Sequence, residues 1–270
     1  MTESGSLNKK YPSLSHSFKC AYPFRLATTS FIYPDHMAPN VRMLGPYIDE
    51  IELLFFESTY EGALPTRQEI HELKRLSGEF GLSYNVHLPL DIDLTAKGAA
   101  VRQQAIETIK YCIELANPLS PTTWTLHLPY EMETGDEFNH WLDRTADSLE
   151  KLCPAHIDGS LISIETLSYP LEWIDVILGT FDLSICLDIG HMAVHGLDWT
   201  TFYNRYAEKI PIVHLYGFQK AHEHLGLDQM PLDVRQSVAN ILKPFSGTLC
   251  LEVFSFNHLE TSLKILGQLT

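Results

Sequence analysis

The run LSICLDIGH, residues 183–191, is the most informative stretch of the chain for its architecture. It is almost entirely apolar as far as Leu187, and Asp188 and His191 follow. A short run that is apolar on both faces is typical of a strand buried in a parallel sheet. Acid and imidazole groups at its carboxyl end are typical of a strand that ends in a functional site.

Seven further runs of this kind occur along the chain. They are RLATTSFI (25–32), EIELLFFE (50–57), SYNVHLP (83–89), TWTLHLP (123–129), LISIETL (161–167), PIVHLYG (211–217) and GTLCLEVF (247–254). The segments between them, such as TRQEIHELKRLSGEFGL (66–82), have apolar residues three and four apart, which predicts amphipathic helices. Eight alternating strand and helix units predict an α/β fold, a closed (β/α)8 TIM barrel.

Length and composition favour one domain. The 270 residues are 45% hydrophobic, which is enough for one sizeable core, and no linker or change of composition divides them. We expect a polar N-terminal tail over residues 1–22 and a single domain over residues 23–270. The chain lacks an apolar leader and a long uninterrupted apolar stretch, so we expect a cytoplasmic protein that does not enter a membrane.

Charge and cysteines exclude other classes. The formal net charge of -15 repels polyanions, so nucleic acid is not an expected partner. Five single cysteines without a CxxC pair predict reduced thiols and no disulfide framework. The sequence leaves the oligomeric state open.

Six consecutive predicted strands, the third to the eighth, end in a residue type that binds divalent metals. These residues are His87, His127, Glu165, Asp188, His214 and Glu252. The residues two positions earlier share the same face of each strand and are mostly small. They are Asn85, Thr125, Ser163, Cys186, Ile212 and Cys250. We therefore expect the six larger polar groups to meet at one mouth of the barrel, above a layer of small side chains.

Convergence favours a metal site over separate structural roles. One strand-end histidine or carboxylate can be a satisfied structural group or a helix cap. Several aimed at one mouth would repel and desolvate each other, whereas divalent cations would neutralise the carboxylates and use the imidazole nitrogens. Nitrogen and oxygen ligands favour Zn²⁺, with Mn²⁺ as the alternative. His191, His222 and His224 follow closely behind their strands as further candidate ligands.

Other residues on this face are candidates for substrate contacts. Glu57, at the end of the second predicted strand, could bind substrate or hold a proton. Aromatic residues after the strands, Tyr130, Trp199 and Phe218 among them, suit a large, flat, partly apolar ligand. Lys97 and Lys220 are the only basic residues in the predicted strand-to-helix loops, and we expect Lys220 to contact substrate.

The motifs VHLP (86–89), LHLP (126–129), IETL (164–167), LDIGH (187–191), VHLYG (213–217), HEHLGL (222–227) and LEVF (251–254) resemble those of the AP endonuclease family 2, or xylose-isomerase-like, superfamily. Its endonuclease IV branch binds three metals at these positions. The resemblance implies two to three metals here, held by His87, His127, Glu165, Asp188, His191, His214, His224 and Glu252. His222 is a weaker member of this set, and Glu223 could serve in its place.

Within that superfamily, the chain is similar to the cobamide-remodelling phosphodiesterases of the CbiR family. The similarity lies in residues 24–58, in VHLPLDIDL (86–94), SYPLEWIDVIL (168–178) and LEVFS (251–255). It implies a corrinoid substrate, cobalamin or adenosylcobalamin. The reaction would be hydrolysis of the nucleotide-loop phosphodiester to cobinamide phosphate and the lower-ligand nucleoside. From their positions at strand ends, we expect Glu165 and Glu57 to be the catalytic residues.

Three alternatives remain. A sugar isomerase or epimerase would need one metal at Glu165, Asp188, His214 and Glu252, which leaves the other histidines unexplained. An endonuclease IV-like abasic-site nuclease would need more basic residues near the phosphates. A non-catalytic metal or ligand carrier on the same barrel would show no turnover.

Overall fold

The computed structural model describes residues 11–60, 62–130, 137–152, 158–169, 172–219 and 222–270. Eight parallel strands form a closed barrel in the order β1-β10-β7-β6-β5-β4-β3-β2. They are β1 (Arg25–Thr29), β2 (Glu50–Leu54), β3 (Ser83–His87), β4 (Trp124–Leu126), β5 (Ile162–Glu165), β6 (Ser184–Asp188), β7 (Ile212–Leu215) and β10 (Thr248–Leu251). Each lies inside one of the eight runs singled out in the sequence, so the predicted barrel is confirmed.

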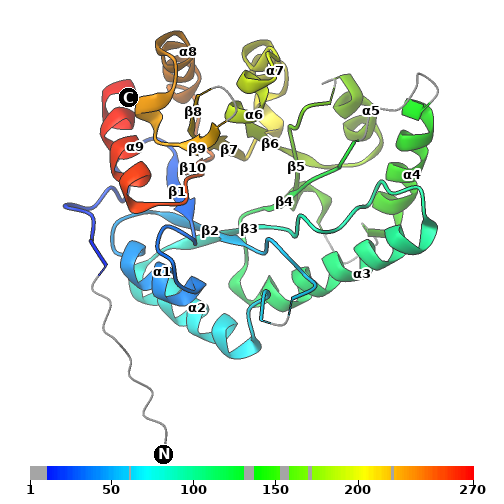
Figure 1. Cartoon of the computed structure of the whole chain (residues 1–270), viewed down its shortest axis with the longest axis horizontal. Helices are drawn as coiled ribbons and strands as arrows, with labels where there is room; N and C mark the ends of the chain where they lie inside the picture. The colour runs from blue at the N-terminus through cyan, green and yellow to red at the C-terminus, as the bar shows by residue number, and fades with distance from the viewer. Residues whose placement is uncertain (1–10, 61, 131–136, 153–157, 170–171, 220–221) are drawn as a thin grey trace, which may run out of the picture.

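Helices follow the barrel strands and form a ring outside them (Figure 1). They are α1 (Met37–Leu44), α2 (Arg67–Phe80), α3 (Ala99–Ala116), α4 (Glu137–Leu152), α5 (Glu172–Thr180), α6 (Ile189–Val194), α7 (Trp199–Tyr206), α8 (Leu232–Leu242) and α9 (Phe256–Leu269). Short 3₁₀ turns occupy Asn117–Leu119, Gly159–Leu161, Ala207–Lys209 and Leu227–Gln229.

The helix α2 shows how local sequence sets such an element. Thr66 caps its first turn and exchanges hydrogen bonds with Glu69 in a capping box, which satisfies amide groups that the helix itself leaves without a partner. Gly81 ends the helix in the left-handed conformation, with φ 58. Ile70, Leu73 and Leu76 lie on its buried face. The helix is therefore held on the barrel by that apolar face.

The inside of the barrel is packed separately from the layer between strands and helices. Ala27, Cys186, Ile212 and Cys250 form a small buried cluster of their own. Asn85, Thr125 and Ser163 are also fully buried. The layer of small inward side chains that strand alternation predicts is thus present beneath the strand ends.

A buried glutamate closes the opposite end of the barrel. Glu50 is fully buried at the start of β2. Its carboxylate accepts hydrogen bonds from Ser83, Asn85 and Thr122, and the guanidinium of Arg25 lies 3.2 Å away. With this many donors, the buried charge is compensated.

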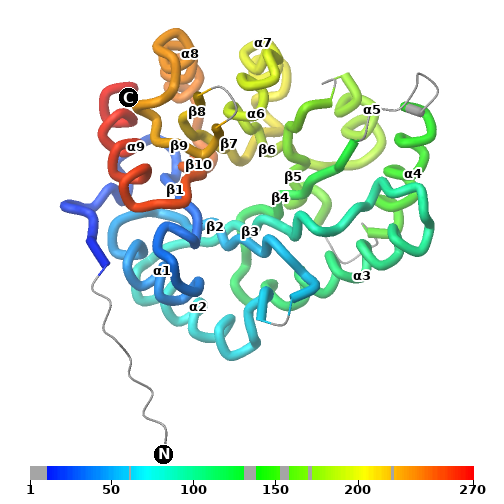
Figure 2. Tube along the Cα trace, in the orientation of Figure 1, coloured from blue at the N-terminus to red at the C-terminus, as the bar shows by residue number. Residues whose placement is uncertain are grey.

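The described part of the N-terminal segment lies against the barrel beside α9 (Figure 2). Leu14 is buried in the main core, and the hydroxyl of Tyr33 donates a hydrogen bond to the carbonyl of Pro12. The ammonium group of Lys19 donates to the carbonyl of Phe80. Residues 11–22, expected as a polar tail, thus contribute contacts to the folded body. Of the helices in the described ranges, none is long and apolar enough to cross a membrane.

A two-stranded antiparallel hairpin follows β7 where the sequence suggested only a loop. It consists of β8 (Gly217–Gln219) and β9 (His222–Leu225). Gly217 is required where the strands meet, because a β-carbon there would lie 1.9 Å from the carbonyl oxygen of Gly226. His224 has φ 55, in the left-handed region that non-glycine residues rarely adopt. The hairpin brings Glu223 and His224 of β9 to the barrel mouth.

Candidate metal centre

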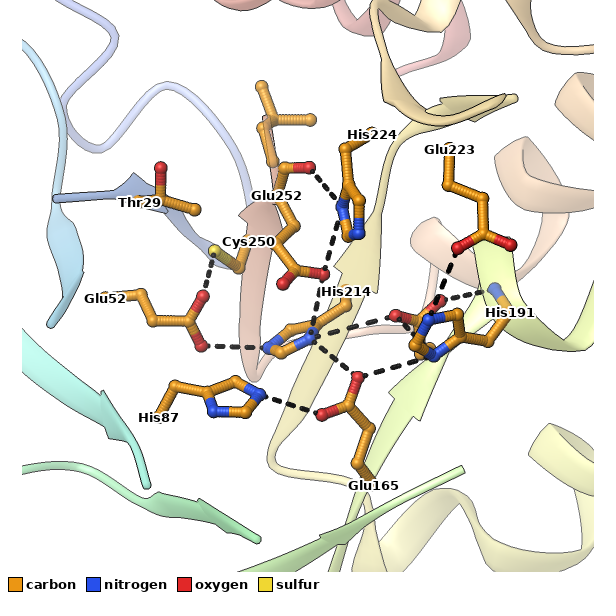
Figure 3. Close-up of polar contacts among 12 residues, drawn as sticks. Thr29, Glu52, His87, Glu165, His191, His214, Glu223, His224, Cys250 and Glu252 are labelled. Carbon is orange, nitrogen blue, oxygen red and sulfur yellow. Dashed lines mark hydrogen bonds and ion pairs between the residues drawn. The ribbon is translucent and has the colours of Figure 1, made fainter. Parts of the chain in front are cut away.

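The six strand-end side chains meet at the mouth formed by the carboxyl ends of the strands. Figure 3 shows His87, Glu165, His214 and Glu252 among them. Together with His191, Glu223 and His224, the six form three groups, in each of which the ligand atoms all lie within 4.8 Å of one another. The groups are His87, His127 and Glu165; Glu165, Asp188, His214 and Glu252; and His191, Glu223 and His224. We call them groups one, two and three.

Group one centres on one oxygen of Glu165. Its Oε2 lies 3.1 Å from Nε2 of His87 and 2.7 Å from Nε2 of His127. The other ring nitrogen of His87 lies 2.9 Å from the carbonyl oxygen of Leu88. A histidine that donates one ring N–H to a carbonyl presents its other nitrogen in a fixed direction, as metal-binding histidines do.

Group two uses the other oxygen of the same glutamate. Nδ1 of His214 lies 3.4 Å from Oε1 of Glu165, 3.3 Å from Oε2 of Glu252 and 4.0 Å from Oδ2 of Asp188. All four side chains are buried. Glu165 therefore joins groups one and two through its two oxygens.

Group three combines helix α6 with the hairpin. Oδ1 of Asp188 accepts a hydrogen bond from the amide of His191 and so caps α6. This places the His191 ring with Nε2 3.7 Å from a carboxylate oxygen of Glu223. Nδ1 of His224 lies 3.1 Å from the carbonyl oxygen of Glu252. The hairpin thus brings Glu223 and His224 to the same mouth.

Buried atoms without partners show that these residues fit metal ions. Within the described residues, no hydrogen-bond partner is found for Oδ2 of Asp188, Nδ1 of His191, Nδ1 of His214 or Oε2 of Glu252. Such atoms are costly when buried unless something binds them. All four belong to groups two and three, and divalent cations at these places would satisfy them. Cys186 also lies within ligand distance of Glu165 and His214, so a thiol borders a set otherwise made of nitrogen and oxygen.

Burial and neighbouring charges shift the pKa values of the carboxylates in this site. Burial raises the pKa of Asp188, and the charges of Glu165 and Glu252 raise it further, well above its usual range. For Glu165, burial is outweighed by His127 and His214, which hold its pKa well below the usual range. Neighbouring buried carboxylates whose pKa values are shifted in opposite directions are typical of a site that binds cations.

The pKa values of two histidines near these carboxylates are shifted in opposite directions. Burial alone would lower the pKa of His87, but its hydrogen bond to Glu165 and the charges of Glu165, Glu52 and Glu252 raise it to about 9. Burial lowers the pKa of His191. A histidine must be neutral to bind a metal, so metal and proton compete at His87.

The sequence analysis missed Glu52. This residue of β2 is fully buried, and its Oε1 lies 2.9 Å from Nε2 of His214. The Cys250 thiol donates to its other oxygen at 3.4 Å. Strand alternation predicts that Glu52 points inward, because it shares a face of β2 with Glu50. The pattern of residues at strand ends does not include it.

Two candidate residues in the described ranges lie outside the groups. His222 is exposed and, among the described residues, belongs to none of the three groups, whereas its neighbour Glu223 does. Glu57 is exposed beyond the end of β2. Lys220 lies outside the described residues.

The aromatic candidates have different surroundings. Trp199 is buried in the core at the start of α7. Phe218 is partly buried in β8. Tyr130 packs edge-on against Trp173, with ring centroids 4.4 Å apart.

An aromatic wall that the sequence analysis did not single out borders the groups directly. The ring centroid of Phe56 lies 5.7 Å from that of Phe31 and 5.9 Å from that of Phe254. Phe254 is 38% exposed and its ring centroid is 5.0 Å from that of His224. The mouth therefore has an apolar side next to its ligand groups.

Solved structures share this fold at low identity. A D-tagatose 3-epimerase-like protein matches with a TM-score of 0.75 and 18% identity, over 91% of this chain and 97% of that one. The probable 3-DHS dehydratase AsbF from Bacillus anthracis matches with a TM-score of 0.71 and 16% identity, over 90% and 99%. Endonuclease IV from Thermus thermophilus matches with a TM-score of 0.66 and 15% identity, over 90% and 99%.

These likenesses establish the barrel and not the reaction. No curated protein matches the chain. Residues 42–267, which include every member of the three ligand groups, match a family described as xylose isomerase-like TIM barrel, AP_endonuc_2. The chain therefore belongs to the xylose isomerase-like TIM barrel family.

Proposed function

We propose that this protein is a metal-dependent phosphodiester hydrolase that acts on the nucleotide loop of a cobamide. The products would be cobinamide phosphate and the lower-ligand nucleoside. The observation that carries the reaction class is the sharing of Glu165 between groups one and two, with group three alongside. A chain that needed one ion would need group two alone.

The ligand side chains divide by exposure into a buried base and an accessible side. Asp188 and His214 have side chains that are 0% exposed. Those of His127, His191 and His224 are 20–27% exposed. A phosphodiester would approach across these three, while the buried residues hold the centre in position from below.

Glu165 is the residue on which the centre depends. Its two oxygens point to different groups, so it fixes their separation and supplies negative charge to both. Divalent ions held there would supply Lewis-acid catalysis, which activates water and stabilises the oxygen that leaves phosphorus. His87 is held through Nδ1 and His214 through Nε2. The other ring nitrogen of each residue therefore faces Glu165.

The proposed substrate rests on the CbiR resemblance and on the chemistry of the mouth. A cobamide has one phosphodiester on a large apolar macrocycle, and Phe31, Phe56 and Phe254 offer an apolar surface beside His224. A nucleic acid would need several cations along its backbone. Arg102 and Arg144 donate hydrogen bonds to the backbone carbonyls of Ala96 and Thr95, in the loop after β3. These two guanidinium groups therefore hold that loop in place.

The test combines metal content with product analysis. Purified protein is loaded with Zn²⁺ or Mn²⁺, assayed for bound metal, and incubated with adenosylcobalamin. We expect two to three equivalents of metal and release of the lower-ligand nucleoside, detected by mass spectrometry. An abasic oligonucleotide under the same conditions is the comparison, and nicking of it without nucleoside release would reject the cobamide assignment.

A second candidate, a sugar epimerase, is favoured by one observation. Group two alone, Glu165, Asp188, His214 and Glu252, makes a complete four-ligand set on a fold shared with the D-tagatose 3-epimerase-like protein. This alternative predicts one equivalent of metal and exchange of a ketose C3 proton with solvent deuterium. It leaves the side chains of groups one and three without a role.

A further inference from the structure

Two glutamates of β2 point into the barrel, and both are fully buried. Glu50 is surrounded by donors from Ser83, Asn85 and Thr122, close to Arg25. Glu52 lies one inward step closer to the mouth. Its carboxylate contacts the ring of a group two residue and a thiol, so its surroundings differ from those of Glu50.

The contact between Glu52 and His214 determines which nitrogen of the ring is free. Oε1 of Glu52 lies 2.9 Å from Nε2, and an ionised carboxylate only accepts hydrogen bonds, so Nε2 has the proton. In a neutral ring, the form that binds metal, Nδ1 then has its lone pair available. That atom is buried, lacks a hydrogen-bond partner among the described residues, and lies within 3.4 Å of oxygens of both Glu165 and Glu252.

The other oxygen of Glu52 is also engaged. Oε2 accepts from the thiol of Cys250 at 3.4 Å, and Cys250 is fully buried in the cluster inside the barrel. Figure 3 shows the resulting chain from Cys250 through Glu52 to His214. Both oxygens of Glu52 are therefore held by side chains from neighbouring parts of the barrel wall.

We propose that Glu52 is a positioning residue for the metal centre: it fixes the tautomer and orientation of His214 so that Nδ1 faces group two, and Cys250 holds Glu52 in place. A carboxylate that accepts the second N–H of a ligating histidine also makes the ring a better donor to metal. Because the proposal concerns metal binding, it holds whichever substrate the centre acts on.

The experiment compares Glu52→Gln and Glu52→Leu with Glu50→Gln in the full chain. Zn²⁺ affinity is measured without substrate, by competition with a chromogenic chelator. Losing an outer partner of a ligating histidine lowers metal affinity about 10–100-fold, so we expect a loss in this range at one site for Glu52→Leu and a smaller loss for Glu52→Gln. Glu50→Gln removes a buried charge from the same face of the same strand and should keep the wild-type affinity.

A spectroscopic readout keeps the test valid if Glu52→Leu does not fold. In the Zn²⁺-loaded wild-type protein with ¹⁵N-labelled histidine, His214, assigned by its absence in a His214→Asn variant, should be protonated at Nε2. Equal affinity losses for Glu52→Gln and Glu50→Gln would make Glu52 a structural residue only. A proton on Nδ1 in the metal-loaded protein would overturn the proposal outright. Neither result depends on cobamide hydrolysis, so the proposed function stands or falls separately.

Discussion

Glu165 is a member of both group one and group two. Oε2 faces His87 and His127, while Oε1 faces His214. This division follows from its place at the end of β5, in the middle of the six ligand-bearing strands. Any change to its carboxylate acts on both groups.

Glu165→Gln should remove metal from groups one and two together. An amide keeps the shape but removes the negative charge, so we expect bound metal to fall by up to two equivalents and activity to fall about 100-fold or more. Elemental analysis and the nucleoside-release assay measure these effects. Glu172→Gln, at an exposed position in α5, is the control. Retention of metal and near-normal turnover in Glu165→Gln would contradict this role.

His87 links metal binding to pH. Its pKa is raised to about 9 from the ordinary 6.5, so it is largely protonated at pH 7 in the metal-free protein. This raised pKa stabilises the metal-free fold fully below about pH 6.5, and that contribution is lost as pH rises through about 9. Metal must displace the proton, so affinity at group one should increase from pH 7 to 9.

Calorimetric titrations in buffers of different ionisation enthalpy test this directly. About one proton per metal at group one should be released at pH 7 and fewer above pH 9. A His87→Asn variant should lose this release. Proton release that does not change between pH 7 and 9 in the wild type would count against it.

The sequence could predict that these side chains meet because strand alternation and strand ends are local properties. His87 and Glu252 both end apolar runs, and the barrel brings such ends together. Strand alternation indicates that Glu52 points into the barrel, but its contact with His214 of β7, a strand with which β2 does not pair, is not encoded by any local pattern. Glu223 could be named only as an alternative to His222, since the choice depends on which way a hairpin faces.

The hairpin β8–β9 is the element least visible in the sequence and the one that completes group three. Its strands are three and four residues long, and the pairing contains a register shift between Gly217 and Gln219. Barrel strands are long enough to show a buried apolar run, whereas this pair is short, polar and half exposed. Alternation over so few residues does not distinguish a strand from a loop.

Gly217→Ala should disrupt group three selectively. The added β-carbon would meet the carbonyl oxygen of Gly226 at 1.9 Å, which forces β8 away from β9 and displaces Glu223 and His224. We expect one equivalent of metal to be lost and stability to fall by about 1–3 kcal/mol. Metal analysis and thermal unfolding measure the two effects.

Gly179→Ala provides the matched control for this substitution. Gly179 lies in α5 with nothing within 4 Å of an added β-carbon. An alanine in a helix is more favourable than glycine by about 0.5–1 kcal/mol, so this variant should be slightly more stable with full metal content. Equal metal loss in both variants would show that the effect is not specific to the hairpin.

Across the whole molecule, the N-terminal segment was the part that composition described least well. Residues 11–22 look polar, yet Leu14 is only 5% exposed and belongs to the main core. One apolar residue in a polar stretch gives no periodic signal, and Leu14 lines a cavity together with residues of α9 from the other end of the sequence. The two ends of the chain come together because the first strand of the barrel pairs with the last.

Leu14→Ala should therefore destabilise the entire domain. We expect the free energy of unfolding to fall by about 2–3 kcal/mol, as for other buried leucines. Ser13→Ala, at the exposed neighbouring position, should change it by no more than about 0.5 kcal/mol. Chemical denaturation of both variants measures these changes. Equal free energies of unfolding for Leu14→Ala and Ser13→Ala would mean that the segment does not contribute to the stability of the fold.

Closure of the barrel by β1 and β10 has a consequence for the persistence of the protein. Group two takes its residues from β5, β6, β7 and the end of β10, so a chain whose last barrel strand has not yet joined the barrel offers no complete set there. Ions that bind only the finished barrel shift the folding equilibrium by mass action, by about 2.7 kcal/mol per site when free metal exceeds its dissociation constant 100-fold. If metal binds as proposed, its supply would set the fraction of chains that open transiently, and with it their rate of loss to proteases. Starved of metal, the protein should be depleted as well as inactive.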